Sequence, residues 1–274
     1  MLKITYFSPL FPAPAGIADY SRDLLPSLSE KVDLNLFAED PAGVDSTLHE
    51  QFPVEPIAAY PDKRWDSDLA WQIRLGRRMR PVQSVHFSKR IVDRSPSIIV
   101  HSHDAAERFS RRSVACPVAV IPHLVAGADG SLLRHRLELP DRTVLFATTG
   151  LVNASKRIDL ALDAFVRLKQ AEPNVFFLIV GGVHTDVNLP KMIHQRRLQD
   201  SVHCTGRVAI EELNGWVAAA DVVIALRHPT LGETSGAAVR ALSTGKPLIV
   251  FDDGWYGELP AEICLQIPPW MLMR

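Results

Sequence analysis

The sequence predicts an α/β protein made of two doubly wound, Rossmann-like domains with mostly parallel sheets. Apolar runs of strand length alternate with helical segments along most of the 274 residues, a pattern typical of parallel strands connected by helices. The apolar fraction of 47% is enough for a full core and argues against intrinsic disorder. Residues 125–142, rich in Gly, Asp, Leu and Arg, resemble a connection, so the predicted domains are 1–124 and 143–274.

The N-terminal half has the weaker pattern. Its predicted strands are Leu2–Phe7, Val32–Phe37, Ser97–His101 and Val118–Pro122, and its predicted helices are Ile17–Ser29, Ala70–Arg80 and Asp104–Arg112. A proline-rich loop, Ser8–Gly16, separates the first strand from the first helix. Between Ala38 and Val85 prolines and aspartates interrupt the periodicity, so the basic helix at 70–80 is the one element predicted there.

The C-terminal half has six apolar runs of strand length with helices between them, which predicts a complete doubly wound domain. Pro173-Asn174 and Gly245 mark the ends of two of these helices. The predicted strands are Thr143–Thr148, Val175–Val180, Val202–Thr205, Val222–Leu226, Pro247–Phe251 and Ile263–Ile267, and the helices are Arg157–Gln170, Leu189–Gln199, Ile210–Ala220 and Ser235–Ser243.

The turns that follow the strands are the candidate ligand-binding segments, because ligands of doubly wound sheets bind outside the carboxyl ends of the strands. Two such domains side by side imply a cleft lined by these turns. The turns are Ser8–Gly16, His101–Asp104, Gly150–Lys156, Gly181–His184, Arg227–Gly236 and Asp252–Gly257. Single residues in or beside the turns that are candidates for this cleft are His103, His123, Arg157 and Gly182.

The segment Gly232–Gly236 has the most specific composition. It opens a helix whose exposed amides and dipole favour a bound anion. Glu233 would repel phosphate, but a carboxylate is suited to accept hydrogen bonds from hydroxyl groups. A phosphate cradle beside a hydroxyl acceptor describes a site for a nucleotide-activated sugar. Thr234 or Ser235 also fits as a helix cap, and Arg227 either neutralises phosphate or pairs with Glu233.

A second candidate segment, Gly150–Lys156, follows a strand and leads into a helix. It places Lys156 and Arg157 in the first helical turn, where anionic side chains are preferred. An ammonium group beside exposed amides can hold a diphosphate by charge and by number of donors. The alternative is that both cations are solvated.

The histidines predict no metal site. Alternation along a strand would place His101 and His103 on one face, with Asp104 next to them, but no further ligands occur at a fitting spacing. His123 either contacts a ligand or fills the hinge between the domains. The sequence has no Gly-x-Ser-x-Gly elbow and no Gly-x-Gly-x-x-Gly signature after the first strand, which argues against a serine hydrolase and a nicotinamide dehydrogenase.

Composition limits the class of partners. Thirty Lys and Arg residues balance 31 Asp and Glu residues, so no basic field for nucleic acid is expected. Three widely spaced cysteines without metal-ligand pairing suit a reducing compartment. No signal peptide or membrane span is evident, which predicts a cytoplasmic protein and leaves peripheral membrane contact open. No cofactor is expected.

These motifs resemble the nucleotide-sugar-dependent, retaining glycosyltransferases of family 4, which have the two-domain GT-B fold. The blocks LRHPTLGETSG, ALSTGKPLIV and GELP resemble a bacterial branch of that family. The resemblance implies that the C-terminal domain binds the donor and the N-terminal domain holds the acceptor. It assigns the donor diphosphate to Lys156 and to amides near Gly16, and the donor sugar to Glu233 with the amides of Thr234–Gly236. It covers most of the chain and is strongest over Tyr6–Leu25, Val118–Val125, Gly150–Leu168 and Val202–Pro260.

The sequence also departs from the family pattern. Ala241 stands where relatives place a second glutamate for the ribose, and Leu151 stands where an arginine often accompanies the lysine. The usual Gly-Gly of the first loop is Ala15-Gly16. The N-terminal domain is expected to be shortened, because residues 80–88 lack a strand and a His-containing turn. The chain is also expected to be truncated, because it stops at Trp270–Arg274 without the final helices of relatives.

The predicted function is transfer of a sugar from a nucleoside-diphosphate sugar to a glycan or lipid-linked acceptor with retention of configuration. Lys156 and Glu233 are the predicted catalytic residues, and Gly16, Arg227 and Thr234–Gly236 complete the donor site. The alternative is a non-catalytic or degenerate sugar-nucleotide-binding protein of the same fold, which the departures favour. A nucleotide-sugar epimerase fits the GETSG block less well.

Overall fold

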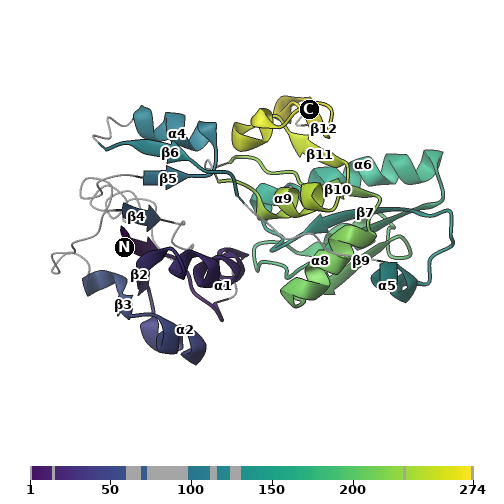
Figure 1. Ribbon diagram of the computed structural model, residues 1–274. Coiled ribbons are helices and arrows are strands. Elements are labelled where there is room, and N and C mark those ends of the chain that lie inside the picture. Colours follow the sequence, from purple (N-terminus) through teal and green to yellow (C-terminus); the bar gives the residue numbers. More distant parts are fainter. Residues whose placement is uncertain are drawn as a thin grey trace. The chain divides into compact units, whose positions relative to one another are not determined.

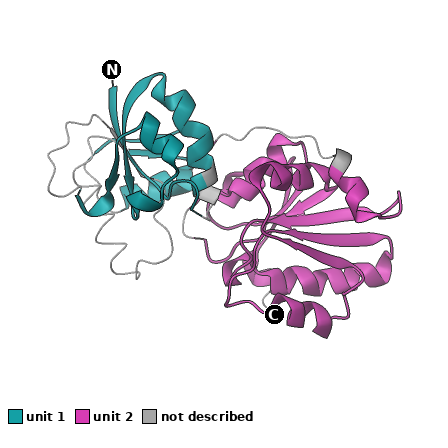
Figure 2. Cartoon of the chain, turned by 90° about the horizontal axis from the view of Figure 1, so that it is seen from below, with its two compact units in different colours: residues 1–122 teal, residues 123–274 magenta. Residues whose placement is uncertain are grey.

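The computed structural model describes residues 2–13, 16–59, 69–72, 98–111, 116–123, 131–230 and 233–272. The chain divides into two compact units, Met1–Pro122 and His123–Arg274 (Figure 2). Within the described residues no helix is both long and apolar enough to cross a membrane.

The N-terminal unit contains a six-stranded sheet in the order β3-β2-β1-β4-β5-β6, with every neighbouring pair parallel. Read by sequence, this is the 3-2-1-4-5-6 order of a doubly wound fold. Its strands are β1 (Leu2–Phe7), β2 (Val32–Ala38), β3 (Val54–Pro56), β4 (Leu69–Gln72), β5 (Ile98–Val100) and β6 (Val118–Val120). Its described helices are α1 (Gly16–Ser29), α2 (Ser46–Gln51) and α4 (His103–Ser110), with short 3-10 helices at Pro41–Gly43 and Ile57–Ala59 (Figure 1).

The helix predicted at 70–80 is wrong at its start, where residues 69–72 form strand β4. Ile4 of β1 aligns with Leu69, and Ala70 aligns with Ile98 of β5, so β4 fills the centre of the sheet. A short apolar run does not distinguish a strand from a helix by its periodicity, and here pairing on both sides decides. Residues 73–80 and 80–88 lie outside the described residues, and the shortened N-terminal domain therefore stays a prediction.

The C-terminal unit contains a second six-stranded sheet, in the order β12-β11-β10-β7-β8-β9 and again parallel throughout. All six predicted strands are confirmed within two residues. The strands are β7 (Val144–Thr149), β8 (Val175–Val180), β9 (Val202–Gly206), β10 (Val222–Ile224), β11 (Leu248–Phe251) and β12 (Cys264–Ile267). The helices between them are α6 (Ile158–Ala171), α7 (Leu189–Gln195), α8 (Ile210–Ala219) and α9 (Gly236–Ser243). Short 3-10 helices lie at Ala154–Lys156, Gly254–Glu258 and Pro269–Leu272.

Helices cover both faces of this second sheet, and each face has its own core (Figure 1). Strand β8 shows the alternation, since Leu178 belongs to one cluster and Phe177 to the other, and both are fully buried. Leu162 of α6 packs in the cluster of Phe177, whereas Val217 of α8 and Ala238 of α9 pack in the cluster of Leu178. The strand order reverses between β7 and β10, where a doubly wound sheet binds its ligand.

The described part of the predicted linker 125–142 folds onto the C-terminal unit. Helix α5 (Ser131–Arg134) continues into a 3-10 helix at His135–Leu137, and Leu133 packs against the core of this unit. Arg134 donates a hydrogen bond of 3.0 Å to the Ala219 carbonyl at the end of α8. Residues 131–142 are therefore part of the C-terminal unit.

We predict that Leu178→Ala lowers the free energy of unfolding of the C-terminal unit by about 2–5 kcal/mol, because it leaves a cavity beside a strand that is paired on both sides. The matched control is Leu265→Ala on edge strand β12, where the side chain is 60% exposed and the expected change is below about 0.5 kcal/mol. Urea denaturation measures both, and equal losses would contradict this description of the core.

Candidate functional site

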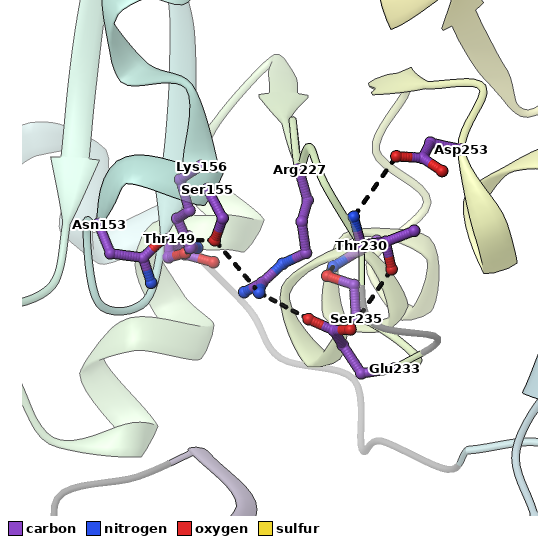
Figure 3. Close-up of polar contacts among 10 residues, drawn as sticks. Thr149, Asn153, Ser155, Lys156, Arg227, Thr230, Glu233, Ser235 and Asp253 are labelled. Carbon is purple, nitrogen blue, oxygen red and sulfur yellow. Dashed lines mark hydrogen bonds and ion pairs between the residues drawn. The ribbon is translucent and has the colours of Figure 1, made fainter. Parts of the chain in front are cut away.

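The loop after β7 brings the Lys156 ammonium back to the end of that strand. The Nζ atom donates a hydrogen bond to the carbonyl oxygen of Thr149, the last residue of β7 (Figure 3). Gly150 leaves space for this arrangement, since a Cβ atom there would lie 3.2 Å from Nζ. Gly181, after β8, has a φ of +138° and packs so closely that its Cβ would lie 2.4 Å from the Gly150 carbonyl oxygen. Glycine is therefore required where the two loops meet.

Lys156 has an unusual electrostatic environment. Desolvation, and then the positive charge of Arg227, lower the pKa of Lys156 from 10.5 to about 7. A lysine that is partly neutral near neutral pH lies beside a guanidinium that stays charged. Such an arrangement favours an anionic ligand, because a nearby negative charge would restore the proton of the ammonium group.

Arg227 links the lysine loop to Glu233. It follows β10, and its Nη1 atom donates hydrogen bonds to Glu233 Oε1 at 2.6 Å and to Ser155 Oγ at 3.5 Å (Figure 3). The side chains of Arg227 and Glu233 are 22% and 20% exposed, so the ion pair is mostly buried. The sequence left open whether Arg227 pairs with Glu233, and the structure shows that it does.

The segment after Glu233 begins helix α9 as expected. Ser235 is the N-cap, and its Oγ accepts a hydrogen bond of 3.2 Å from the Ala238 amide, which confirms the capping role. Gly236 is the first residue of the helix, and Thr234 is partly exposed. Helix α9 therefore begins three residues after Glu233 in the sequence.

Sequence reasoning singled out no residue of the turn after β11, although it expected this turn to line the site. Tyr256 is 2% exposed, and burial raises the pKa of its phenol, while hydrogen bonds with Ser235 and Arg227 act in the opposite direction. Asp253 accepts hydrogen bonds from His228 Nδ1 at 2.8 Å and from the Thr230 amide at 3.4 Å. Asp253 and Tyr256 could have been suspected as site residues only because they follow the end of a strand, since nothing in the local sequence distinguishes them.

The other residues predicted for the site lie in both units. Gly16 is the first residue of α1 in the N-terminal unit, and His103 is the exposed first residue of α4. His123 is partly exposed and is the first residue of the C-terminal unit. Arg157 precedes α6, and its guanidinium bonds to Asp159 at 3.0 and 3.2 Å.

Gly182 joins the loops after β7 and β8, because its carbonyl accepts a hydrogen bond of 2.8 Å from the Val152 amide.

The structure brings Lys156, Arg227 and Glu233 into one cluster with Ser155 and Thr230, at the point where the strand order of the C-terminal sheet reverses. In the described part of the chain, no three His, Cys, Asp or Glu side chains gather as metal ligands would.

Residues 131–262, just under half of the chain, match the family described as "Glycosyl transferases group 1". The fold is similar to sucrose-phosphate synthase from Thermosynechococcus elongatus and to HepE from Anabaena in complex with UDP. Each has a TM-score of 0.73 and 19% identity, over 98% of this chain and 86% of the other. WaaG, a glycosyltransferase involved in lipopolysaccharide biosynthesis, has a TM-score of 0.73 and 12% identity over the same shares. No curated protein matches in sequence.

The structural similarity establishes the GT-B fold, and the family match identifies a glycosyltransferase group 1 domain within residues 131–262. The family match spans the whole cluster from Lys156 to Tyr256. The fold similarity covers both units of the chain.

We predict that Lys156→Met raises the Tm of the ligand-free protein at pH 6.5 by a few degrees, on the order of 1 kcal/mol, because it removes a desolvated charge. The Lys156 pKa is about 7 when folded and near 10.5 when unfolded, so the unfolded state binds more protons between these values. Wild-type stability gains from rising pH in that window, and the difference from the variant should close toward pH 10. Thermal melting at pH 6.5 and 9.5 measures this, and a constant difference would contradict it.

Proposed function

We propose that the protein transfers a sugar from a nucleoside-diphosphate sugar to a glycan or lipid-linked acceptor with retention of configuration. The observation that carries the proposal is the cluster of Lys156, Arg227 and Glu233 at the strand-order reversal of the C-terminal sheet. Two cationic groups suit a diphosphate, and the adjoining carboxylate suits sugar hydroxyls.

In this proposal the cations stabilise the departing diphosphate. Negative charge develops on the leaving group in the transition state, and Lys156 and Arg227 would meet it in a largely desolvated site. The amides of Thr234–Gly236 add donors and the positive end of the α9 dipole. No side-chain base is assigned, because in the family that the sequence resembles a donor phosphate oxygen is thought to take the acceptor proton.

Glu233 would orient the donor sugar. It is held now by Arg227, and a bound diphosphate would compete for the same guanidinium. The pair would then loosen, and the carboxylate oxygens would accept hydrogen bonds from sugar hydroxyls. HepE has been solved with UDP and with UDP-glucose, which supports a donor of this class for a chain with the same fold.

One observation favours the alternative of a non-catalytic sugar-nucleotide-binding protein. Ala241, where the family pattern places a ribose-binding glutamate, is fully buried in the core. A protein that binds the nucleotide without turnover would fit this loss.

We predict that wild type is stabilised in thermal-shift screening by one base series among UDP, GDP and ADP and their glucose or mannose conjugates. Lys156→Ala should weaken that binding at least tenfold at pH 6.5, because it removes a charge-assisted contact. The matched control, Lys191→Ala on the exposed surface of α7, should bind like wild type.

Equal affinity of Lys156→Ala and wild type would contradict the proposed site. The same donors incubated with glycan and lipid-linked acceptors separate the two functions. A product with the donor's anomeric configuration supports the transferase, and binding without any product supports the alternative.

A further inference from the structure

Asp253, two residues after the end of β11, holds His228 and Thr230 in the turn that follows β10. Its Oδ2 atom accepts a hydrogen bond from His228 Nδ1 at 2.8 Å. The same atom accepts a second hydrogen bond from the Thr230 amide at 3.4 Å (Figure 3). The side chains of His228 and Asp253 are 33% and 25% exposed, so the contact is partly shielded from water. The backbone of the same turn is held from its other side, where the His228 amide donates to the Ser155 carbonyl at 2.8 Å.

Thr230 transmits this anchoring to Glu233. Its side chain is 7% exposed, and its Oγ1 atom donates a hydrogen bond of 3.3 Å to Glu233 Oε2. Arg227 holds the other oxygen, Oε1, at 2.6 Å. Each oxygen of the Glu233 carboxylate is thus held by a different group, and the chain behind one of those groups is tied to Asp253.

We propose that Thr230 and Asp253 are positioning residues that hold the Glu233 carboxylate for the donor sugar. This inference rests on the proposed function. A carboxylate has about four lone-pair sites, and the Thr230 hydroxyl occupies one of them and fixes the plane of the group. When a diphosphate draws Arg227 away from Oε1, the bond from Thr230 keeps Glu233 in place. The energy of the sugar contacts is then not lost in ordering a free side chain.

We expect the two anchors to affect the sugar contacts more than the diphosphate contacts. Thr230 and Asp253 bond to Glu233, His228 and each other, whereas Lys156 bonds to Thr149 at the end of β7. Loss of the anchors should therefore reduce the gain in affinity that the sugar brings, and leave the affinity for the bare nucleoside diphosphate almost unchanged.

The test compares Kd values for UDP with UDP-glucose and for GDP with GDP-mannose, by calorimetry. The measured quantity is the Kd of the bare diphosphate divided by the Kd of its sugar conjugate. It is compared among wild type, Thr230→Val, Thr230→Ser and Asp253→Asn. Thr230→Val and Asp253→Asn should lower this ratio by about five- to tenfold, the effect of losing one hydrogen bond to a charged group. The Kd of the bare diphosphate should change by less than about twofold. Thr230→Ser keeps the hydroxyl and should keep the wild-type ratio.

Several outcomes would overturn the inference. They are an unchanged ratio in Thr230→Val, an equal loss in Thr230→Ser, or an equal weakening of the bare diphosphate. If Thr230→Val does not fold, as judged by its melting curve, Asp253→Asn decides in its place. A wild type that binds UDP or GDP without any gain from the sugar overturns this inference and leaves the phosphate site standing. A wild type that binds no nucleotide overturns the proposed function and this inference together.

Discussion

The ion pair of Arg227 with Glu233, beside the desolvated ammonium of Lys156, is the interaction on which the rest of the site depends. It joins the turn after β10 to the start of α9, and Ser155 joins the same guanidinium to the loop after β7. Breaking one partner of a mostly buried pair leaves the other charge uncompensated, which costs several kcal/mol. A ligand that supplies both a diphosphate and hydroxyl groups can replace each half of the pair with an equivalent partner.

The fold explains why these groups meet. Lys156 and Arg227 are 71 positions apart, but β7 and β10 are neighbours where the strand order reverses, so the turns after them converge. The glycines at 150 and 181 allow the loops after β7 and β8 to approach closely. Desolvation of Lys156 lowers the stability of the ligand-free protein, and in the proposed function the same desolvation favours a bound anion.

Sequence reasoning predicted the C-terminal sheet well and the N-terminal sheet less well, for physical reasons. Runs such as 175–180 are buried on both faces and flanked by clear turns, so their apolar residues are continuous. Strand β4 has four residues, and it is a strand because it pairs with β1 and β5. This pairing is not encoded in the local sequence pattern. The grouping of Lys156 with Glu233 followed from their places after strands. The roles of Thr230, Asp253 and Tyr256 depend on side-chain directions set by packing, which composition does not reveal.

Proton uptake during binding shows whether a diphosphate restores the charge of Lys156. Titration of UDP, or of the diphosphate with the tightest binding, in buffers of different ionisation enthalpy at pH 8 gives the number of protons taken up. Because the pKa of Lys156 is about 7 in the free protein, wild type should take up close to one proton and Lys156→Met none. Binding without proton uptake in wild type, or equal uptake in the variant, would contradict it.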